Sequence, residues 1–402
     1  MPCIAHSEVR SSKRATHGAA PTKIHPAKLT LSTSLLILFL MIFAPLVVQA
    51  RGDIGITVES VDTVNEAFRG SAEWRGSDCA YSFPISDSRS LWLFGDTLIH
   101  QPKSHDVMIN NTAAWLDQSG PGEISMQFFW KIKDGQPAPV LKPAQADEWY
   151  WPGDGIVFDG KLWIFMKRVR RAMKPGPDES QFDWYADDLV CLQPANGDPT
   201  QWKVETFAVP EQGSALFGTA CTRDHKYVYV YCSSIKFRSG LNAHPAIVAR
   251  IPNSALRDSS IKDWQFWNGK TKNWSSSIDD ATVVIPDAAP EMTVSFIPGN
   301  SNCKYVAIYM PPLSDKIMMR TARYPEGPFS DPILVYQAPE AHIRIDGKAV
   351  GAYSAKAHPE LELSTSQDLI VTYCTNPGGL KELGMRPDLY FPHALKIHFP
   401  DK

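Results

Sequence analysis

The stretch Ile156-Val157-Phe158-Asp159-Gly160-Lys161-Leu162-Trp163-Ile164-Phe165 predicts a β-hairpin. Two runs of β-branched and aromatic residues flank Asp159-Gly160, and Asp-Gly favours the left-handed backbone of a two-residue hairpin turn. Similar paired runs, or their second strand, recur in four other parts of the chain. The second strands begin near positions 91, 162, 228, 306 and 369, in steps of 71, 66, 78 and 63 residues. The chain therefore contains a repeat with a period of about 70 residues.

This period predicts an all-β chain folded as a five-bladed β-propeller of four-stranded antiparallel blades, because four short strands and their connections fill such a repeat. The 32 Pro and 25 Gly residues agree with many turns and short elements. A length of 402 residues would otherwise suggest two or three domains, but the repeat assigns residues 51–402 to one propeller domain. The spacing alone leaves open a pair of β-sandwiches or an irregular all-β fold.

The first fifty residues have the layout of a signal peptide with a long basic region. Five Lys and Arg residues precede an apolar run over residues 35–48, and small residues follow before Arg51. A membrane-spanning helix needs about 20 apolar residues, so cleavage near Ala50 is favoured over an uncleaved anchor. We therefore expect a secreted or periplasmic protein with no stable membrane span after cleavage.

The charge that remains after residue 50 excludes some classes of partner. Residues 51–402 carry 35 Lys and Arg against 42 Asp and Glu, an excess of acid that disfavours nucleic acid and anionic membranes. Six of the seven Cys lie in this part, and an even number permits disulfides, although buried free thiols fit equally well. No Cys and His spacing indicates zinc, and no phosphate-binding loop indicates a nucleotide. No cofactor is expected to be required.

Acidic residues occur where the first strands of the blades begin, and these strands line the channel of a propeller. Asp78, Asp154 and Glu291 occupy such places, with His358 in the last repeat. If the first hairpin turns around Asp87, Asp96 lies opposite Asp78, with Cβ atoms about 4.5–5.5 Å apart. Two carboxylates so close cannot both ionise freely, and a protonated acid beside an ionised one suits glycosidic bond cleavage.

Other roles stay open for these positions. Asp78 and Asp96 could each bond backbone N–H groups in a turn, and turn chemistry is favoured for Asp154 in Pro152-Gly153-Asp154-Gly155. Arg320 could reach the channel or bridge blades. His358 could be a core histidine, a sugar donor, or a residue near a central structural ion such as calcium.

Aromatic residues point to a sugar ligand. Trp74 and Trp151 lie just ahead of the Asp78 and Asp154 positions, and flat apolar rings near carboxylates suit the C–H faces of sugars. Trp92 and Trp163 are expected to pack within or between blades. The basic run over residues 167–171 is expected to be a solvated loop.

The first repeat resembles a known family. Trp74-Arg75-Gly76-Ser77-Asp78, followed by Leu91-Trp92-Leu93-Phe94-Gly95-Asp96-Thr97, is similar to a signature of exported bacterial five-bladed propellers of formerly unknown function. This group includes endo-D-arabinanase glycoside hydrolases. Residues 324–329, Tyr-Pro-Glu-Gly-Pro-Phe, look like a turn of many five-bladed glycosidases. The sequence after Asp78 departs from the Gly-rich stretch of the arabinanase-like members, which indicates a distant branch.

This resemblance implies catalytic roles for three residues. In arabinanase-like members the paired aspartates of the first blade are the catalytic candidates, and they match Asp78 and Asp96. In the wider five-bladed glycosidases an Asp of the first blade is the base and a Glu of a later blade is the acid, which would be Glu291.

The leading hypothesis is an exported glycoside hydrolase that cleaves a polysaccharide, arabinan-like or another plant or cell-wall glycan. Asp78 would be the base or nucleophile, and Asp96 or Glu291 the proton donor. Substrate contacts are expected from Trp74, Trp151, Asp154, Arg320 and His358. The alternatives are a carbohydrate-binding propeller without catalysis and a structural propeller that binds other proteins.

Overall fold

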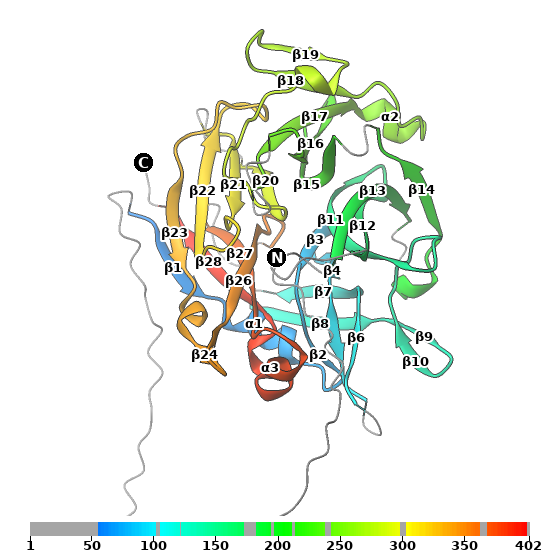
Figure 1. The fold of residues 1–402 in the computed structure, drawn as a ribbon, viewed down its shortest axis with the longest axis vertical. Coiled ribbons are helices and arrows are strands. Elements are labelled where there is room, and N and C mark those ends of the chain that lie inside the picture. The colour runs from blue at the N-terminus through cyan, green and yellow to red at the C-terminus, as the bar shows by residue number, and fades with distance from the viewer. Residues whose placement is uncertain are drawn as a thin grey trace, which may run out of the picture.

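Five antiparallel sheets stand in a closed ring in the computed structural model of the chain (Figure 1). The structure describes residues 55–101, 105–120, 122–172, 182–193, 197–210, 214–237, 243–297, 303–361 and 368–399. The predicted five-bladed β-propeller is confirmed. The expected signal peptide over residues 1–50 lies outside the described residues.

Blades 1 and 2 are the first two sheets along the chain, and each has four strands. The strands of blade 1 are β3 (Tyr81–Ser86), β4 (Arg89–Phe94), β7 (Thr112–Gly120) and β8 (Glu123–Phe129). Those of blade 2 are β11 (Glu148–Phe158), β12 (Lys161–Arg171), β13 (Phe182–Leu192) and β14 (Val204–Ala208).

Blade 3 has a fifth strand, in contrast to the four predicted for every blade. Its strands are β15 (Ala215–Arg223), β16 (Tyr227–Ser234), β17 (Ala246–Pro252), β18 (Gln265–Asn268) and β19 (Asn273–Ser275). The strands of blade 4 are β20 (Met292–Phe296), β21 (Tyr305–Tyr309), β22 (Lys316–Ala322) and β23 (Ile333–Gln337).

Blade 5 is built from both ends of the described chain. Its strands are β26 (Gly351–Ala357), β27 (Asp368–Asn376), β28 (Pro392–His398) and β1 (Thr57–Ser60). Strand β1 pairs with β28 from Thr57 opposite His398 to Ser60 opposite Leu395, so the N-terminal strand forms the outer edge of the last blade. This pairing closes the ring.

Smaller elements decorate the ring. The strands are β2 (Trp74–Ser77), β5 (Thr97–Ile99), β6 (Val107–Ile109), β9 (Lys131–Lys133), β10 (Gln136–Ala138), β24 (Arg344–Ile345) and β25 (Lys348–Ala349). The helices are α1 (Asp62–Arg69), α2 (Asn253–Arg257) and α3 (Leu380–Met385), with 3₁₀ turns at Pro199–Gln201, Ile278–Asp280, Pro339–His342 and Pro387–Leu389. None of the described helices is long and apolar enough to cross a membrane.

The hairpins turn where the sequence predicts. Asp159 and Gly160 have φ of 48° and 71°, which is the left-handed pair that an Asp-Gly turn requires. In blade 1, Tyr81 pairs with Leu93 and Phe83 with Leu91, which is the register of a hairpin centred on Asp87.

Large aromatic rings fill the spaces around the strands. Trp92 and Trp163 are buried, as predicted. Trp74 is also fully buried, because its ring stacks on Phe128 at 4.3 Å between centroids and its Nε1 donates to Thr112 Oγ1. A ring so enclosed cannot stack on a sugar, which corrects the expected substrate-binding role of Trp74.

The basic run over residues 167–171 is the second correction. It is the end of strand β12 rather than a solvated loop, and the Lys167 side chain is fully buried. Lys167 lies in the part of the strand that is buried on both faces, while Arg170 and Arg171 stand at its exposed end. Cys79, Cys191, Cys221, Cys232 and Cys374 are free thiols.

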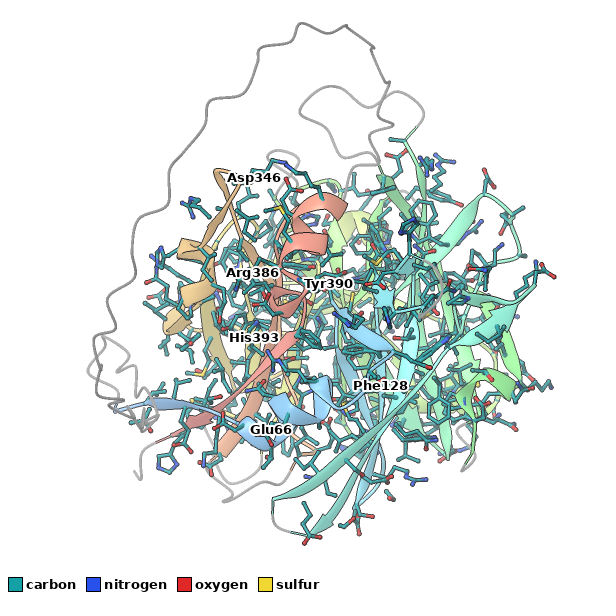
Figure 2. The ribbon with its side chains drawn as sticks, turned by 90° about the horizontal axis from the view of Figure 1, so that it is seen from below. Glu66, Phe128, Asp346, Arg386, Tyr390 and His393 are labelled. Atoms are coloured by element: carbon teal, nitrogen blue, oxygen red, sulfur yellow. The ribbon has the colours of Figure 1, made fainter. Side chains whose placement is uncertain are left out.

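Gly76 allows two distant segments to approach. Its φ is 135°, and a Cβ atom there would lie 1.8 Å from the carbonyl oxygen of Tyr390. Figure 2 shows Tyr390 on the segment that leads from α3 towards β28, between Arg386 and His393. The blade 1 extension and the C-terminal segment are therefore in direct backbone contact at this glycine.

Replacing Gly76 with Ala is expected to lower the free energy of unfolding by about 3 kcal/mol, because left-handed strain and overpacking each cost roughly 1–3 kcal/mol. Gly160→Ala is the control, since Gly160 also has positive φ but a Cβ atom there would meet no other atom within 4 Å. Urea unfolding of both variants measures the difference. Equal losses in the two variants would contradict the steric part of the argument.

Candidate active site

The innermost strands of the five blades, β3, β11, β15, β20 and β26, surround the axis of the ring (Figure 1). Contacts join β3 to β11, β11 to β15, β15 to β20 and β20 to β26. Glu291 directly precedes β20, and Asp78 lies just before β3. The two carboxylates are close enough to repel each other.

Glu291 is the centre of a buried ion cluster. Its Oε1 lies 3.1 Å from Lys167 Nζ, and its Oε2 lies 3.3 Å from Lys356 Nζ. Ser354 Oγ donates to Oε2, and Cys79 Sγ lies 3.3 Å from Oε1. Burial alone would raise the pKa of Glu291, but the two ammonium groups hold it well below its usual range. Glu291 is therefore ionised at neutral pH and cannot deliver a proton.

Asp78 is placed by a strained turn. Cys79 and Ala80 follow it with φ of 66° and 57°, a left-handed backbone that is uncommon for residues other than glycine. Lys356 Nζ donates to the carbonyl oxygen of Cys79 at 2.5 Å, which holds the turn. Tyr353 donates its hydroxyl hydrogen to Asp78 Oδ2 at 2.8 Å. A Cβ atom on Gly95 would lie 2.3 Å from Asp78 Oδ1, so this oxygen occupies space that only glycine leaves.

Asp96 lies beside Asp78, as the hairpin register predicts. Ser77 pairs with Thr97, and Gly95 donates its N–H to the carbonyl oxygen of Asp78 at 3.0 Å. Asp96 Oδ1 accepts hydrogen bonds from Trp151 Nε1 at 2.9 Å and from Asn110 Nδ2 at 3.2 Å. Both of these donors are side chains, so they hold the carboxylate in a different way from the backbone N–H groups of a turn.

Burial raises the pKa values of both aspartates. Burial, followed by repulsion from Asp96 and Glu291, raises the pKa of Asp78 to about 8. Burial raises the pKa of Asp96 to about 6, against the hydrogen bonds from Trp151 and Asn110. Both pKa values are therefore raised, and Asp78, which Asp96 and Glu291 both repel, is the carboxyl group of the pair that more strongly favours the protonated form.

Asp154 links two blades through hydrogen bonds to backbone N–H groups. Its carboxylate accepts the N–H of Gly155 at 2.8 Å and the N–H of Cys221 at 2.7 Å, which ties blade 2 to blade 3. Burial raises its pKa to about 7 despite these two bonds. The turn chemistry that the sequence favours for Asp154 agrees with these contacts.

His358 and Arg320 face other residues of the protein. The His358 ring stacks on Trp92, and its Nδ1 and Nε2 lie 2.5 Å and 2.7 Å from the hydroxyl oxygens of Ser82 and Thr372. Burial lowers its pKa to about 3, so the imidazole is neutral. Arg320 donates to Asp287, Tyr309 and the carbonyl oxygen of Ser330, all within or next to blade 4. Neither side chain suits a substrate contact.

The donor set does not fit a central calcium ion at His358. Both of its ring nitrogens are already hydrogen-bonded, and calcium prefers oxygen ligands. Across the part of the chain that the structure describes, no three His, Cys, Asp or Glu side chains gather as a metal site would require.

Three site residues were not predicted from the sequence. Lys167 and Lys356 are buried and neutralise Glu291, and Tyr353 contacts Asp78. Neither lysine carried a signal in the sequence, because the groups that cover a strand side chain come from other strands and not from the residues next to it. Lys167 also belongs to the basic run over residues 167–171, which was expected to be solvated.

The family model that matches residues 62–398 is described as a domain of unknown function, DUF5005. The chain belongs to this family. A comparison with curated proteins gives no match.

The DUF5005 chain is similar to several solved structures. One is a candidate hydrolase from Bacteroides ovatus, at 18% identity and a TM-score of 0.67, over 85% of this chain and 90% of that one. Another is a GH43_1 enzyme from Xanthomonas citri, at 11% identity and a TM-score of 0.44, over 81% and 88% of the two chains. A third is a GH43 β-xylosidase/α-arabinofuranosidase from a compost metagenome, at 11% identity and a TM-score of 0.44, over 88% and 94%. The likeness to the first supports the propeller fold.

The raised pKa of Asp78 predicts a stability gain when its charge is removed. An unfolded aspartate ionises near 3.8, whereas Asp78 keeps its proton to about 8, so its contribution to stability falls as the pH rises through this interval. Asp78→Asn abolishes this loss and should gain at least about 2 kcal/mol on wild type between pH 4 and pH 8. Urea unfolding across this range measures the gain, with Asp117→Asn on the surface of blade 1 as control. A difference that does not change with pH would refute the assignment.

Proposed function

We propose that this protein is an exported glycoside hydrolase that cleaves a polysaccharide beside the axis of its propeller. The observation that carries the proposal is the Asp78–Asp96 pair, two adjacent carboxyl groups that strand register places opposite each other and whose pKa values are both raised by burial. Glycosidic bond cleavage needs a protonated acid next to an ionised carboxylate. The signal-peptide layout of residues 1–50 supports export.

The order of the two pKa values suggests the roles. Asp78 is the proton donor to the glycosidic oxygen, because its pKa is about 8. Tyr353 donates to Oδ2, which leaves Oδ1 to carry the proton. Asp96 is ionised above about pH 6 and attacks the anomeric carbon or activates a water molecule. This order reverses the roles first expected, in which Asp78 was the base or nucleophile.

Adjacent carboxyl groups favour a retaining outcome. Carboxyl groups about 5 Å apart suit a covalent glycosyl intermediate, whereas a wider gap leaves room for a water molecule and inversion. The alternative donor, Glu291, is kept ionised by its two lysines, and one of these, Lys356, positions the Asp78 turn instead. Lys356 also favours the carboxylate that Asp78 becomes after it has given up its proton.

Arabinan is the first polymer to test, because the first-blade motif resembles that of endo-D-arabinanases. Trp151 is placed to orient Asp96 through its Nε1 hydrogen bond. A glycan-binding propeller without catalysis is the second candidate. The Glu291 carboxylate is fully engaged by Lys167, Lys356 and Ser354, so it is not available as an acid, and this favours the second candidate.

Asp78→Asn and Asp96→Asn are each expected to lower kcat/KM by about 10²–10⁴-fold, the usual worth of a general acid or base. Release of reducing sugar from arabinan, xylan and pectic glycans measures the rate. Asp117→Asn is the matched control, since it removes a carboxylate from the same blade at an ion pair with Arg89. Wild-type turnover by Asp78→Asn would exclude the mechanism, and glycan affinity without any product would favour the binding propeller.

The two pKa values also predict a bell-shaped pH profile. Activity should rise as Asp96 ionises near pH 6 and fall as Asp78 loses its proton near pH 8. Measurements of kcat/KM from pH 4 to pH 10 check both limbs, and Asp78→Asn should lose the alkaline limb of any residual activity. A profile that is flat between pH 7 and pH 10 would show that Asp78 is not the donor.

A further inference from the structure

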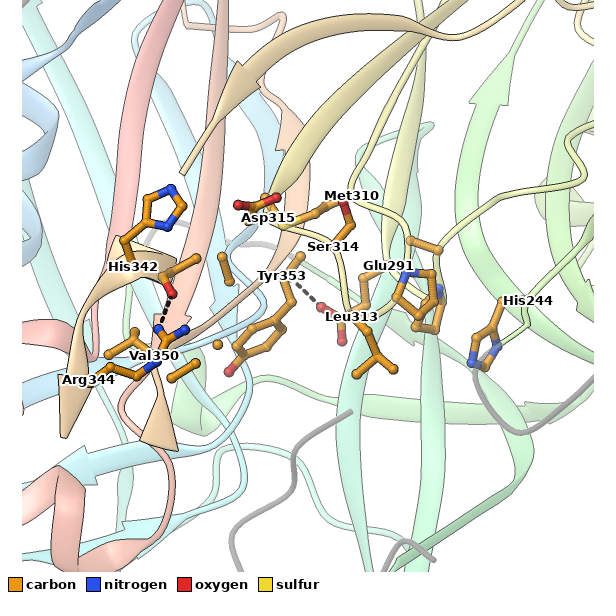
Figure 3. Close-up of a pocket in the computed structure, with 18 residues that line it drawn as sticks. His244, Glu291, Met310, Leu313, Ser314, Asp315, His342, Arg344, Val350 and Tyr353 are labelled. Carbon is orange, nitrogen blue, oxygen red and sulfur yellow. Dashed lines mark hydrogen bonds between the residues drawn. The ribbon is translucent and has the colours of Figure 1, made fainter. Parts of the chain in front are cut away.

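A cavity of about 470 Å³ lies between blades 4 and 5 (Figure 3). We call it the blade 4–5 cavity. Its lining includes Glu291, Met310, Leu313, Arg344, Tyr353 and Ser354. Tyr353 connects the cavity to the chemistry, because the same side chain that lines the cavity donates its hydroxyl hydrogen to Asp78. A molecule in the cavity therefore lies within one side chain of the proposed proton donor.

The cavity has the size and the strained backbone of a ligand site. Its volume falls in the range of about 300–1,000 Å³ that small-molecule sites occupy. Leu313 and Ser354 both have positive φ, at 61° and 63°. Strained backbone of this kind persists where the surrounding structure enforces it and is concentrated at functional sites. Leu313 is 79% exposed, which is unusual for a leucine whose side chain borders a cavity.

Arg344 brings an uncompensated positive charge to the cavity wall. Its Nη1 donates to the carbonyl oxygens of Ala341 and Ile343, at 2.9 Å and 3.2 Å. No carboxylate among the described residues forms an ion pair with it. The backbone carbonyls fix the guanidinium group without neutralising it, and the remaining N–H donors can meet a ligand.

Two carboxylates also border the cavity. Glu291 is neutralised by two lysines, and Asp315 accepts a hydrogen bond from Gln337 Nε2 at 2.8 Å. The imidazoles of His342 and His244 also border the cavity. Arg344 is the one Lys or Arg side chain in the described lining.

We propose that the blade 4–5 cavity is a subsite for a sugar residue that carries a carboxylate, bound by Arg344. An arginine guanidinium group matches a carboxylate with two parallel N–H···O bonds, which a neutral sugar cannot offer. The Leu313 side chain and the Tyr353 ring supply apolar surface for the C–H face of the ring. The inference rests on the proposed function to the extent that it takes the ligand to be a glycan, and it adds glycans with acidic residues to the candidate substrates.

Binding of trigalacturonate, compared with its fully methyl-esterified form, tests the subsite at pH 7. The ester has the same rings and linkages but no charge. Calorimetry or NMR titration uses the full protein carrying Asp78→Asn, so that no ligand is hydrolysed. We expect the acid to bind at least 10-fold more tightly than the ester, and Arg344→Gln to remove this preference while leaving the affinity for the ester unchanged.

Arg323→Gln is the matched control, because Arg323 is an exposed arginine of blade 4 that does not line the cavity. Arg344→Lys keeps the charge without the planar fork, and it should retain only part of the preference. The inference would be overturned if the protein that keeps Arg344 bound acid and ester equally well. It would also be overturned if Arg323→Gln lost the preference for the acid as Arg344→Gln does. The hydrolase proposal is decided separately, since a protein that prefers the acid but cleaves no polymer keeps the subsite and loses the enzyme.

Discussion

The buried Glu291 carboxylate is the constraint on which the rest of the site depends. Through Lys167 it reaches blade 2, through Lys356 and Ser354 it reaches blade 5, and its own strand belongs to blade 4. Lys356 extends the cluster to blade 1 by bonding the carbonyl oxygen of Cys79. Breaking such a cluster at one partner leaves a buried charge unpaired, which typically costs about 3–5 kcal/mol. The ring geometry and the position of Asp78 are therefore coupled.

Charge balance explains why the aspartates hold a proton. The two lysines and Glu291 leave one net positive charge, and the pair of Asp78 and Asp96 contributes one negative charge when it holds a single proton. A second ionisation would leave the cluster with an excess of negative charge in a desolvated place. The site thus keeps a carboxylic acid protonated near neutral pH by arranging charges around it. A proton donor needs this property.

The sequence predicts the parts of the structure that depend on neighbours along the chain. The Asp159-Gly160 turn and the hairpin around Asp87 are local, and the latter places Asp96 beside Asp78. The partners of Glu291 are not local, because Lys167 lies 124 residues away and meets it only when the ring closes. The ring that covers Trp74, Phe128, is likewise distant from it along the chain. Alternation shows that one face of a strand is buried, but it does not identify what lies opposite that face.

The pairing of β1 with β28 also sets the order in which the protein can fold. Blade 5 lacks its outer strand until residues 395–398 have been made, although residues 57–60 are made long before them. Contacts between such distant parts of the chain form slowly, because a long loop must close first. The ring therefore stays open until the strand that pairs with β1 has been made, and the four other blades can form before it closes.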